Sequence, residues 1–246
     1  MSKNQKAALV TGAATGIGRA VAVRLAKMGY AVAVNYSRSE AEAQETLGEV
    51  RACSVPAMLC KCSVGADVEV RKMVARCKEE FGGLDVLVNN AGTTHFIDHK
   101  NLEALTDAVW DDILTVNLKG TFYCCRAAMP LLKERKGSIV NVTSVAGLQG
   151  IGSSIPYAAS KAALNCLTKS LARAFAPEVR VNAVAPGPVL TRWLANHMDL
   201  VERSLEQTPL RRAAMPDDVA DAVVFLAAGT TLMTGQVLVV DGGRTM

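Results

Sequence analysis

Short apolar segments alternate with amphipathic segments along almost the whole of this chain. Each apolar segment is long enough for a buried strand, and most are followed by a stretch in which apolar residues recur every three or four positions. When strands and helices alternate in this way, each helix carries the chain back to the same end of the sheet, so the strands pair in parallel. The pattern predicts an α/β fold: a doubly wound parallel sheet of about seven strands with helices on both faces.

Apolar periodicity gives expected bounds for these elements. We expect strands near 6–11, 31–36, 57–62, 85–89, 138–144, 179–185 and 236–241. We expect helices near 16–28, 39–52, 66–81, 102–133, 156–176 and 216–228. The 246 residues are the length of one undivided α/β domain, so we expect a single domain over 1–246.

The stretch 191–210 interrupts the alternation of strands and helices. It carries Trp193, His197 and Met198 between two segments that contain proline. A stretch of this kind is typical of a lid that closes over bound ligands. The alternative is an ordinary surface helix whose apolar side packs on the body of the protein.

Composition argues against several classes of partner. Half of the residues are apolar, a fifth are charged and the net charge is +4, with no block of lysine and arginine. Nucleic acid is therefore not expected as a partner. No apolar run has the roughly 18 residues needed to span a bilayer, and the first six residues lack the apolar core of a signal peptide. We expect no membrane partner and a cytoplasmic location.

The seven cysteines are predicted to be buried, reduced thiols rather than metal ligands. Among them, Cys60 and Cys62 fall in a predicted strand, and Cys124, Cys125 and Cys166 fall in predicted helices. No two cysteines have Cys-x2-Cys spacing, and no histidine joins them at the spacing of a zinc site. His95 and His99 are four apart but fall in a predicted loop, so no metal is expected.

The first apolar segment runs directly into a glycine-rich turn. The turn spans Thr11 to Gly18, its glycines have Gly-x3-Gly-x-Gly spacing, and a predicted helix follows through Met28. Glycines let a pyrophosphate approach the backbone, and the start of a helix offers free N–H groups to it. The order therefore indicates a nucleotide site. The spacing departs from Gly-x-Gly-x2-Gly, and the alternative is a turn with a structural role only.

Tyr157 and Lys161 stand four positions apart, and Ser144 lies thirteen positions before the tyrosine. Residues four apart on a helix share one face, so the lysine ammonium can stabilise the ionised phenol. An isolated tyrosine titrates near 10, and lowering its pKa to about 7 takes roughly 4 kcal/mol, which a nearby cation and a bound cationic cofactor can supply. These residues predict a proton donor for a carbonyl; the alternative is a chance pair on a helix.

Several motifs occur in an order and at spacings that match one enzyme family. They are the glycine turn at 12–18, Asn89-Asn90-Ala91-Gly92, Asn117 in Val116-Asn117-Leu118-Lys119-Gly120, Ser144, Tyr157, Lys161 and Pro186-Gly187. With these motifs the chain resembles the classical short-chain dehydrogenase/reductase family over residues 6 to 243. The resemblance implies a Rossmann-type fold and an oxidoreductase that uses a nicotinamide cofactor.

The resemblance also implies a catalytic tetrad of Asn117, Ser144, Tyr157 and Lys161. Tyr157 would donate its proton to the carbonyl oxygen, and Ser144 would hold that oxygen. Lys161 would bind the ribose and lower the pKa of the phenol. Asn117 would position the water that reprotonates the site.

The end of the second predicted strand favours NADP(H) over NAD(H). Members of the family that prefer NAD usually carry an aspartate there, and this chain has Tyr36. Arg38, between Ser37 and Ser39, is suited to a phosphate dianion. The alternative for Arg38 is an arginine that simply faces solvent. Thr15 stands where many NADP-preferring relatives have a basic residue.

The resemblance implies further cofactor contacts. Ser63 replaces an aspartate that holds the adenine in many relatives, the Asn90 backbone matches a ribose contact, and the Thr191 hydroxyl matches a contact to the carboxamide. The full set of expected cofactor contacts is Gly12, Thr15, Gly16, Ile17, Gly18, Tyr36, Ser37, Arg38, Ser63, Val64, Asn90, Ala91, Gly92, Tyr157, Lys161, Pro186, Gly187, Val189 and Thr191.

The resemblance is strongest to 3-oxoacyl-(acyl-carrier-protein) reductases, which implies reduction of a 3-oxoacyl thioester or a related ketone. Arg173 matches one arginine that docks the carrier, whereas Met129 occupies the other place and Arg126 lies one turn earlier. Acyl carrier protein therefore stays an open alternative as a partner. Other open alternatives are a sugar, polyol or alcohol dehydrogenase and a non-catalytic NADP-binding module.

Family resemblance and one helix pattern predict a homotetramer. The helix at 156–176 has apolar or small residues around much of its girth, including Ala158, Ala162, Leu164, Leu167, Leu171 and Phe175. We expect it and the 102–133 helix to pack against their copies, with the strand 236–241 near a second two-fold axis. The alternative is that this helix face packs entirely within one chain.

Overall fold

A parallel sheet of seven strands forms the centre of the protein, in a computed structural model that describes residues 5–246 apart from the side chain of Leu200. The strand order is β3-β2-β1-β4-β5-β6-β7, and every pairing is parallel. The strands are β1 (Ala7–Val10), β2 (Ala31–Tyr36), β3 (Ala57–Lys61), β4 (Val86–Asn89), β5 (Ser138–Val142), β6 (Arg180–Pro186) and β7 (Val237–Val240). This architecture confirms the predicted doubly wound sheet.

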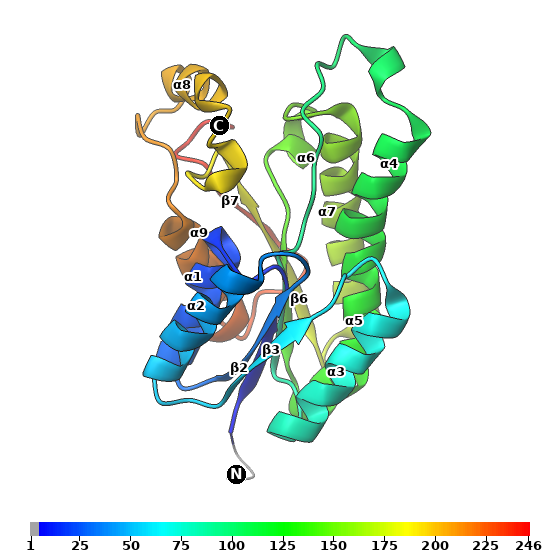
Figure 1. Cartoon of the computed structure of the whole chain (residues 1–246), viewed down its shortest axis with the longest axis vertical. Helices are drawn as coiled ribbons and strands as arrows, with labels where there is room; N and C mark the ends of the chain where they lie inside the picture. The colour runs from blue at the N-terminus through cyan, green and yellow to red at the C-terminus, as the bar shows by residue number, and fades with distance from the viewer. Residues whose placement is uncertain (1–4) are drawn as a thin grey trace.

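Helices cover both faces of the sheet (Figure 1). One layer holds α1 (Gly16–Lys27), α2 (Glu40–Ala52) and α9 (Pro216–Val224). The other holds α3 (Asp67–Phe81), α4 (Asp107–Leu114), α5 (Thr121–Arg135) and α7 (Ile155–Phe175). The short α6 (Ala146–Gln149) precedes α7, and α8 (Met198–Glu206) stands beyond the end of the sheet.

The sheet separates two hydrophobic cores because successive side chains on a strand point to opposite faces. Leu9 and Leu87 belong to the core shared with α3 and α5. Val10 and Val88 belong to the core shared with α1 and α9. Burial on both faces explains why these strands are continuous apolar runs rather than alternating ones.

The predicted helix at 102–133 is wrong in its bounds and its continuity. A 3-10 turn, η1 (Leu102–Ala104), comes first, and its N-terminus is capped by the Asn101 side chain, which accepts a hydrogen bond from the Ala104 N–H. The α-helix then begins only at Asp107, and a π-helical turn, η2 (Thr115–Gly120), separates α4 from α5. A second π turn, η4 (Phe225–Gly229), follows α9. Single π turns often occur at functional sites.

The predicted lid region contains a 3-10 turn, η3 (Arg192–Leu194), and α8. Figure 1 shows α8 at the end of the molecule where the chain also terminates. Whether this segment moves stays a prediction. Within residues 5–246, no helix combines the length and the apolar character needed to cross a bilayer.

All seven cysteines are free thiols, and five are buried. Burial raises the pKa of Cys60 to about 11 and that of Cys62 to about 12. The prediction was wrong for Cys166, which is exposed, because it lies on the side of α7 that faces away from the sheet. Cys53 is partly buried.

Candidate active site

The predicted site residues gather at the carboxyl end of the sheet. The glycine turn follows β1, Asn90 follows β4, Ser144 follows β5 and Gly187 follows β6. The strand order reverses direction between β1 and β4, which is the point where open α/β sheets bind their ligands. Sequence positions far apart therefore meet at one crevice.

The local structure of α7 places Tyr157 and Lys161 in its first two turns. Ser154 caps this helix by accepting a hydrogen bond from the Tyr157 N–H at 3.4 Å, and Pro156 stands in the first turn, where a missing N–H costs nothing. Ser144 follows β5, and its hydroxyl accepts a hydrogen bond from the Ala146 N–H at 3.1 Å at the start of α6. This hydrogen bond fixes the position of the serine side chain.

The Tyr157 hydroxyl is hydrogen-bonded to the Ser144 side chain. Burial nevertheless raises the pKa of Tyr157 to about 12, against the lowering by the Ser144 hydrogen bond. The prediction that the pKa of Tyr157 is lowered is thus wrong for the protein chain alone. The physical reason is that loss of solvation penalises the phenolate.

Lys161 is buried beside the tyrosine, and among residues 5–246 no carboxylate stabilises its charge. Its Nζ donates a hydrogen bond to the Val142 carbonyl oxygen at 2.9 Å and lies 5.6 Å from the centroid of the Tyr157 ring. Burial lowers the pKa of Lys161 to about 8. The ammonium thus points at one face of the Tyr157 ring from a desolvated position.

Asn117 lies in the π turn between α4 and α5 and is completely buried. Its Oδ1 accepts from the Thr93 N–H at 2.8 Å, and its Nδ2 donates to the Thr93 carbonyl oxygen and to Ser160 Oγ at 3.1 and 3.0 Å. The side-chain amide thus joins the loop after β4 to α7. Its predicted role in positioning water stays a prediction.

The glycine turn is packed against the end of β4. The Asn90 side chain donates to the carbonyl oxygens of Thr11 and Gly12, both at 3.0 Å. A Cβ on Gly12 would lie 2.9 Å from the Ala91 Cα, and one on Gly18 would lie 2.4 Å from the Gly12 carbonyl oxygen. Only glycine leaves room for this backbone at both positions.

The residues of this turn fit the pyrophosphate of a dinucleotide. Thr15 is the N-cap of α1, and its side chain makes no capping hydrogen bond, so the first N–H groups of the helix are available to an anion. No acidic residue lies in the first turn of α1 to repel one. Gly16 and Ile17 open the helix, and Gly92 lies across the crevice beside Lys161.

The other predicted cofactor contacts lie at or after the ends of β2, β3 and β6. Tyr36 and Val64 are buried, whereas Ser37, Arg38 and Ser63 are exposed. Within residues 5–246 the Arg38 guanidinium has no ion-pair partner. At the opposite side Pro186 ends β6, and Gly187, Val189 and Thr191 lead toward η3.

The sequence did not single out Asn35 or Arg192 as site residues, and it indicated Trp193 only as part of the predicted lid. Asn35 on β2 accepts a hydrogen bond from the Gly12 N–H at 3.1 Å and donates to the Cys60 and Cys62 carbonyl oxygens, both at 3.0 Å. Trp193 lies over the tyrosine, with ring centroids 6.2 Å apart. Arg192 contacts the start of α2. For Asn35, the only signal in the sequence was the presence of an asparagine inside an apolar strand.

Apolar side chains are exposed on the loop after β4, on α6, on η3 and on α8. Phe96 stacks on His197 with centroids 3.6 Å apart, joining the loop after β4 to the start of α8. Trp193, Phe96, Met198 and Leu148 are all exposed, between 36% and 48% of their surfaces. Among residues 5–246, no three His, Cys, Asp or Glu side chains come together as metal ligands could; His95 pairs with Asp112 instead.

Known proteins match the chain over almost its full length. A family profile described as Enoyl-(Acyl carrier protein) reductase matches residues 12–245. A Burkholderia xenovorans protein solved under the name short-chain dehydrogenase/reductase superposes with a TM-score of 0.93 and 37% identity, over 99% of each chain. The chain belongs to the short-chain dehydrogenase/reductase family.

Within the short-chain dehydrogenase/reductases, two relatives carry names that state a reaction. One, assigned as a granaticin polyketide synthase ketoacyl reductase from Streptomyces violaceoruber, is 46% identical over 96% of this chain and 94% of its own length. The other, a Staphylococcus epidermidis 3-oxoacyl-(acyl-carrier-protein) reductase, is 41% identical over 98% and 99%. As a member of the family, this protein is an oxidoreductase that acts on the CH–OH/C=O pair.

Proposed function

We propose that this enzyme reduces a ketone, and that its substrate is a 3-oxoacyl thioester or a related ketone. The observation that carries the proposal is the hydrogen-bonded pair of Tyr157 and Ser144 hydroxyls, with the exposed ring of Trp193 beside Tyr157. An acyl chain could pack on Trp193 and Phe96 and lose its hydration there. A sugar would instead need polar partners for its many hydroxyls.

The protonation states fit reduction at neutral pH. Because the pKa of Tyr157 is raised to about 12, the phenol carries its proton at pH 7 and can donate it to a carbonyl oxygen. The Ser144 hydroxyl would hydrogen-bond to the same oxygen. A bound nicotinamide supplies the hydride. Lys161, with a pKa of about 8, carries positive charge beneath the ring and would stabilise the phenolate that forms when Tyr157 gives up its proton.

The substrate proposal is tested by comparing two reactions. We expect reduction of an acetoacetyl thioester with NADPH to be faster, in kcat/KM, than oxidation of glucose with NADP+. The reverse order would favour a sugar dehydrogenase, and no turnover in either direction would favour a non-catalytic binding module.

A cytoplasmic location stays a prediction from the sequence.

We propose NADP(H) as the cofactor because Arg38 is exposed next to Ser37 just after β2 and has no ion-pair partner among the described residues 5–246. Arg38→Asp is expected to lower the ratio of kcat/KM for NADPH to that for NADH by about ten- to a hundredfold, since one charge-assisted contact to phosphate is worth about 1.5 to 3 kcal/mol. Arg51→Asp, the same charge change at the far end of α2, is the matched control. An unchanged ratio in Arg38→Asp would reject the contact.

Acyl carrier protein stays a possible partner rather than part of the proposal. Met129 is buried, so it offers no surface to a carrier. Arg126 is exposed, but its guanidinium pairs with Asp67 at 2.8 Å and lies over the Phe122 ring. Arg173 is exposed at the end of α7. A free acetoacetyl thioester therefore suits the first assay.

We propose that four copies assemble. Some residues that prompted this expectation, Ala158, Leu164 and Leu171, are buried within the chain itself, but Ala159, Ala162 and Cys166 form an exposed stripe on α7. The short side chains of the stripe allow close approach of a second helix.

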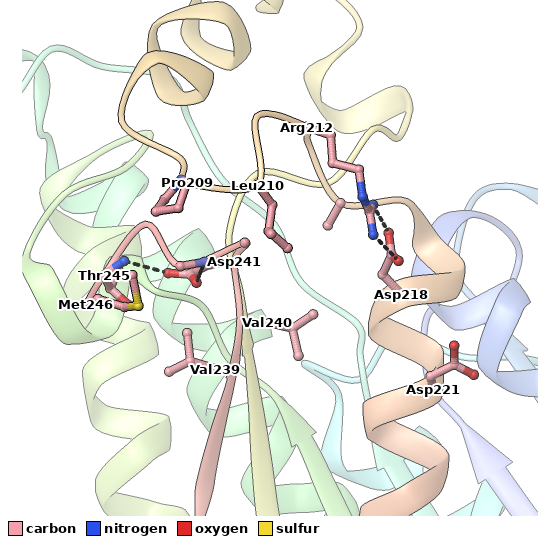
Figure 2. Close-up of a pocket in the computed structure, with 13 residues that line it drawn as sticks. Pro209, Leu210, Arg212, Asp218, Asp221, Val239, Val240, Asp241, Thr245 and Met246 are labelled. Atoms are coloured by element: carbon pink, nitrogen blue, oxygen red, sulfur yellow. Dashed lines mark hydrogen bonds and ion pairs between the residues drawn. The ribbon is translucent and has the colours of Figure 1, made fainter.

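A second exposed region follows the edge strand β7. Figure 2 shows Val239 and Val240 on this strand and Leu210 nearby. The three residues line a hollow of about 780 Å³, and none of the predicted cofactor or catalytic residues lines it. Val239 is 38% exposed and Leu210 66% exposed. Exposed apolar groups on an edge strand are usually covered by a partner.

Light scattering at micromolar concentration is expected to return about four times the chain mass of 26.0 kDa. Ala162→Glu, which places a charge on the exposed stripe of α7, is expected to reduce the mass to that of a dimer or a monomer. Glu42→Gln on α2 lies far from both surfaces and serves as a control. A mass near 26 kDa for the unaltered chain would reject the assembly.

A further inference from the structure

The 3-10 turn η3 crosses the cofactor crevice and contacts the start of α2. Arg192 Nη2 donates to Ser39 Oγ at 2.6 Å, and Arg192 Nη1 lies 2.8 Å from Glu42 Oε1. These contacts join residues 150 or more positions apart. Just before them, the Thr191 side chain lies against Gly16 of the glycine turn. The turn thus reaches from one side of the crevice to the other.

Ser39 follows Arg38 directly, so Arg192 and Glu42 lie beside the proposed phosphate site. Within residues 5–246 the charges there are already partnered, except that of Arg38. Glu40 pairs with Lys61 at 2.9 Å, and Arg19 pairs with Glu45 and Glu49. Among residues 5–246, Glu42 has one cationic partner, which is Arg192. Without Arg192, a free carboxylate would stand next to the place where a phosphate dianion has to bind.

We infer that Arg192 is a positioning residue for cofactor recognition, which acts by neutralising the Glu42 carboxylate beside the 2′-phosphate site and so leaves Arg38 free to attract the phosphate. The inference rests on the proposed use of NADP(H). A carboxylate near this site repels a 2′-phosphate, while NADH and ADP lack the group that would be repelled. The effect of Arg192 is therefore specific to the phosphorylated ligand.

The ion pair contributes little to the stability of the fold. The side chains of Arg192 and Glu42 are 57% and 37% exposed, and pairs of this kind are worth little in folding free energy. Variants at either position are therefore expected to fold, and a change in ligand preference can be separated from loss of structure by thermal unfolding.

The test measures binding of two fragments, 2′,5′-ADP and ADP, by calorimetry. Neither fragment contains the nicotinamide, so the readout does not depend on turnover. Arg192→Ala is expected to weaken 2′,5′-ADP about tenfold while ADP changes less than about twofold, the scale of a screened surface charge. Adding Glu42→Ala to Arg192→Ala is expected to restore 2′,5′-ADP binding, and Arg192→Lys should stay near the unaltered protein. Arg203→Ala in α8, which removes another exposed ion pair of the same region, is the control.

Two results would overturn the inference. Equal weakening of both fragments would mean that Arg192 only holds η3 in place. A selective loss for 2′,5′-ADP that Glu42→Ala does not restore would mean that Arg192 does not act through Glu42. The unaltered protein decides the cofactor separately, because tighter binding of ADP than of 2′,5′-ADP would reject NADP(H) itself, whatever the variants do.

Discussion

Tyr157→Phe is expected to lower kcat by a factor of about 10² to 10⁴ while NADPH binding stays close to that of the unaltered enzyme. The substitution removes the hydroxyl that is hydrogen-bonded to Ser144 and keeps the ring that packs near Trp193. The loss belongs in kcat because the proton is needed in the transition state rather than for binding.

Steady-state kinetics with an acetoacetyl thioester and calorimetric titration of NADPH check both halves of this expectation. Tyr30→Phe is the matched control, since Tyr30 is a buried tyrosine at the start of β2 and far from the crevice. If Tyr157→Phe kept more than about a tenth of the activity, Tyr157 could not be the general acid.

Gly147→Ala is expected to lower kcat more than tenfold and to lower the free energy of unfolding by about 1 to 3 kcal/mol, the usual range for overpacking. A Cβ at this position would lie 2.4 Å from the Lys161 carbonyl carbon and 2.5 Å from the Ala162 nitrogen. Both atoms are backbone of α7 and cannot rotate away, so α6 has to move. Ser144 is hydrogen-bonded to α6 and would move with it, away from Tyr157.

Gly48→Ala is the control for the glycine substitution. Gly48 lies within α2, and a Cβ there meets nothing within 4 Å, so alanine is expected to raise stability by about 0.5 to 1 kcal/mol. Thermal unfolding and steady-state kinetics report both effects. Unchanged kcat and unchanged stability in Gly147→Ala would show that the close packing of α6 on α7 does not position Ser144.

The sheet and the location of the site could be predicted because both depend on local patterns. Ala31–Tyr36 has the bounds expected from the sequence, since all six residues are buried and the run is apolar almost throughout. The residues that follow strand ends were placed correctly at one edge because parallel strands share a direction.

Features decided by contacts across the fold could not be predicted. The π turn at Asn117 depends on hydrogen bonds to Thr93 and Ser160, which no local periodicity reveals. The direction of the pKa change at Tyr157 depends on how deeply the hydroxyl is buried, whereas sequence spacing shows only which charges lie nearby. The contact between Arg192 and Ser39 joins segments 153 positions apart.

Burial of the Lys161 ammonium lowers the free energy of unfolding of the ligand-free protein at neutral pH. Its pKa falls from 10.5 to about 8 on folding, so between these values the folded state binds fewer protons than the unfolded state and stability rises with pH. The cost at pH 7 is about 3 kcal/mol. Tyr157 acts oppositely at higher pH, because its pKa rises from 10.0 to about 12 and stability falls across that interval.

The proposed catalytic role of Lys161 and the stability of the fold are therefore in conflict. The ammonium of Lys161 is desolvated even without a bound ligand. Packing elsewhere in the core therefore has to offset the free-energy cost of this desolvation. Lys161→Met is expected to raise the melting temperature and to remove the ammonium on which the proposed mechanism depends. A ligand that gives the ammonium a hydrogen-bond acceptor would restore part of the lost stability.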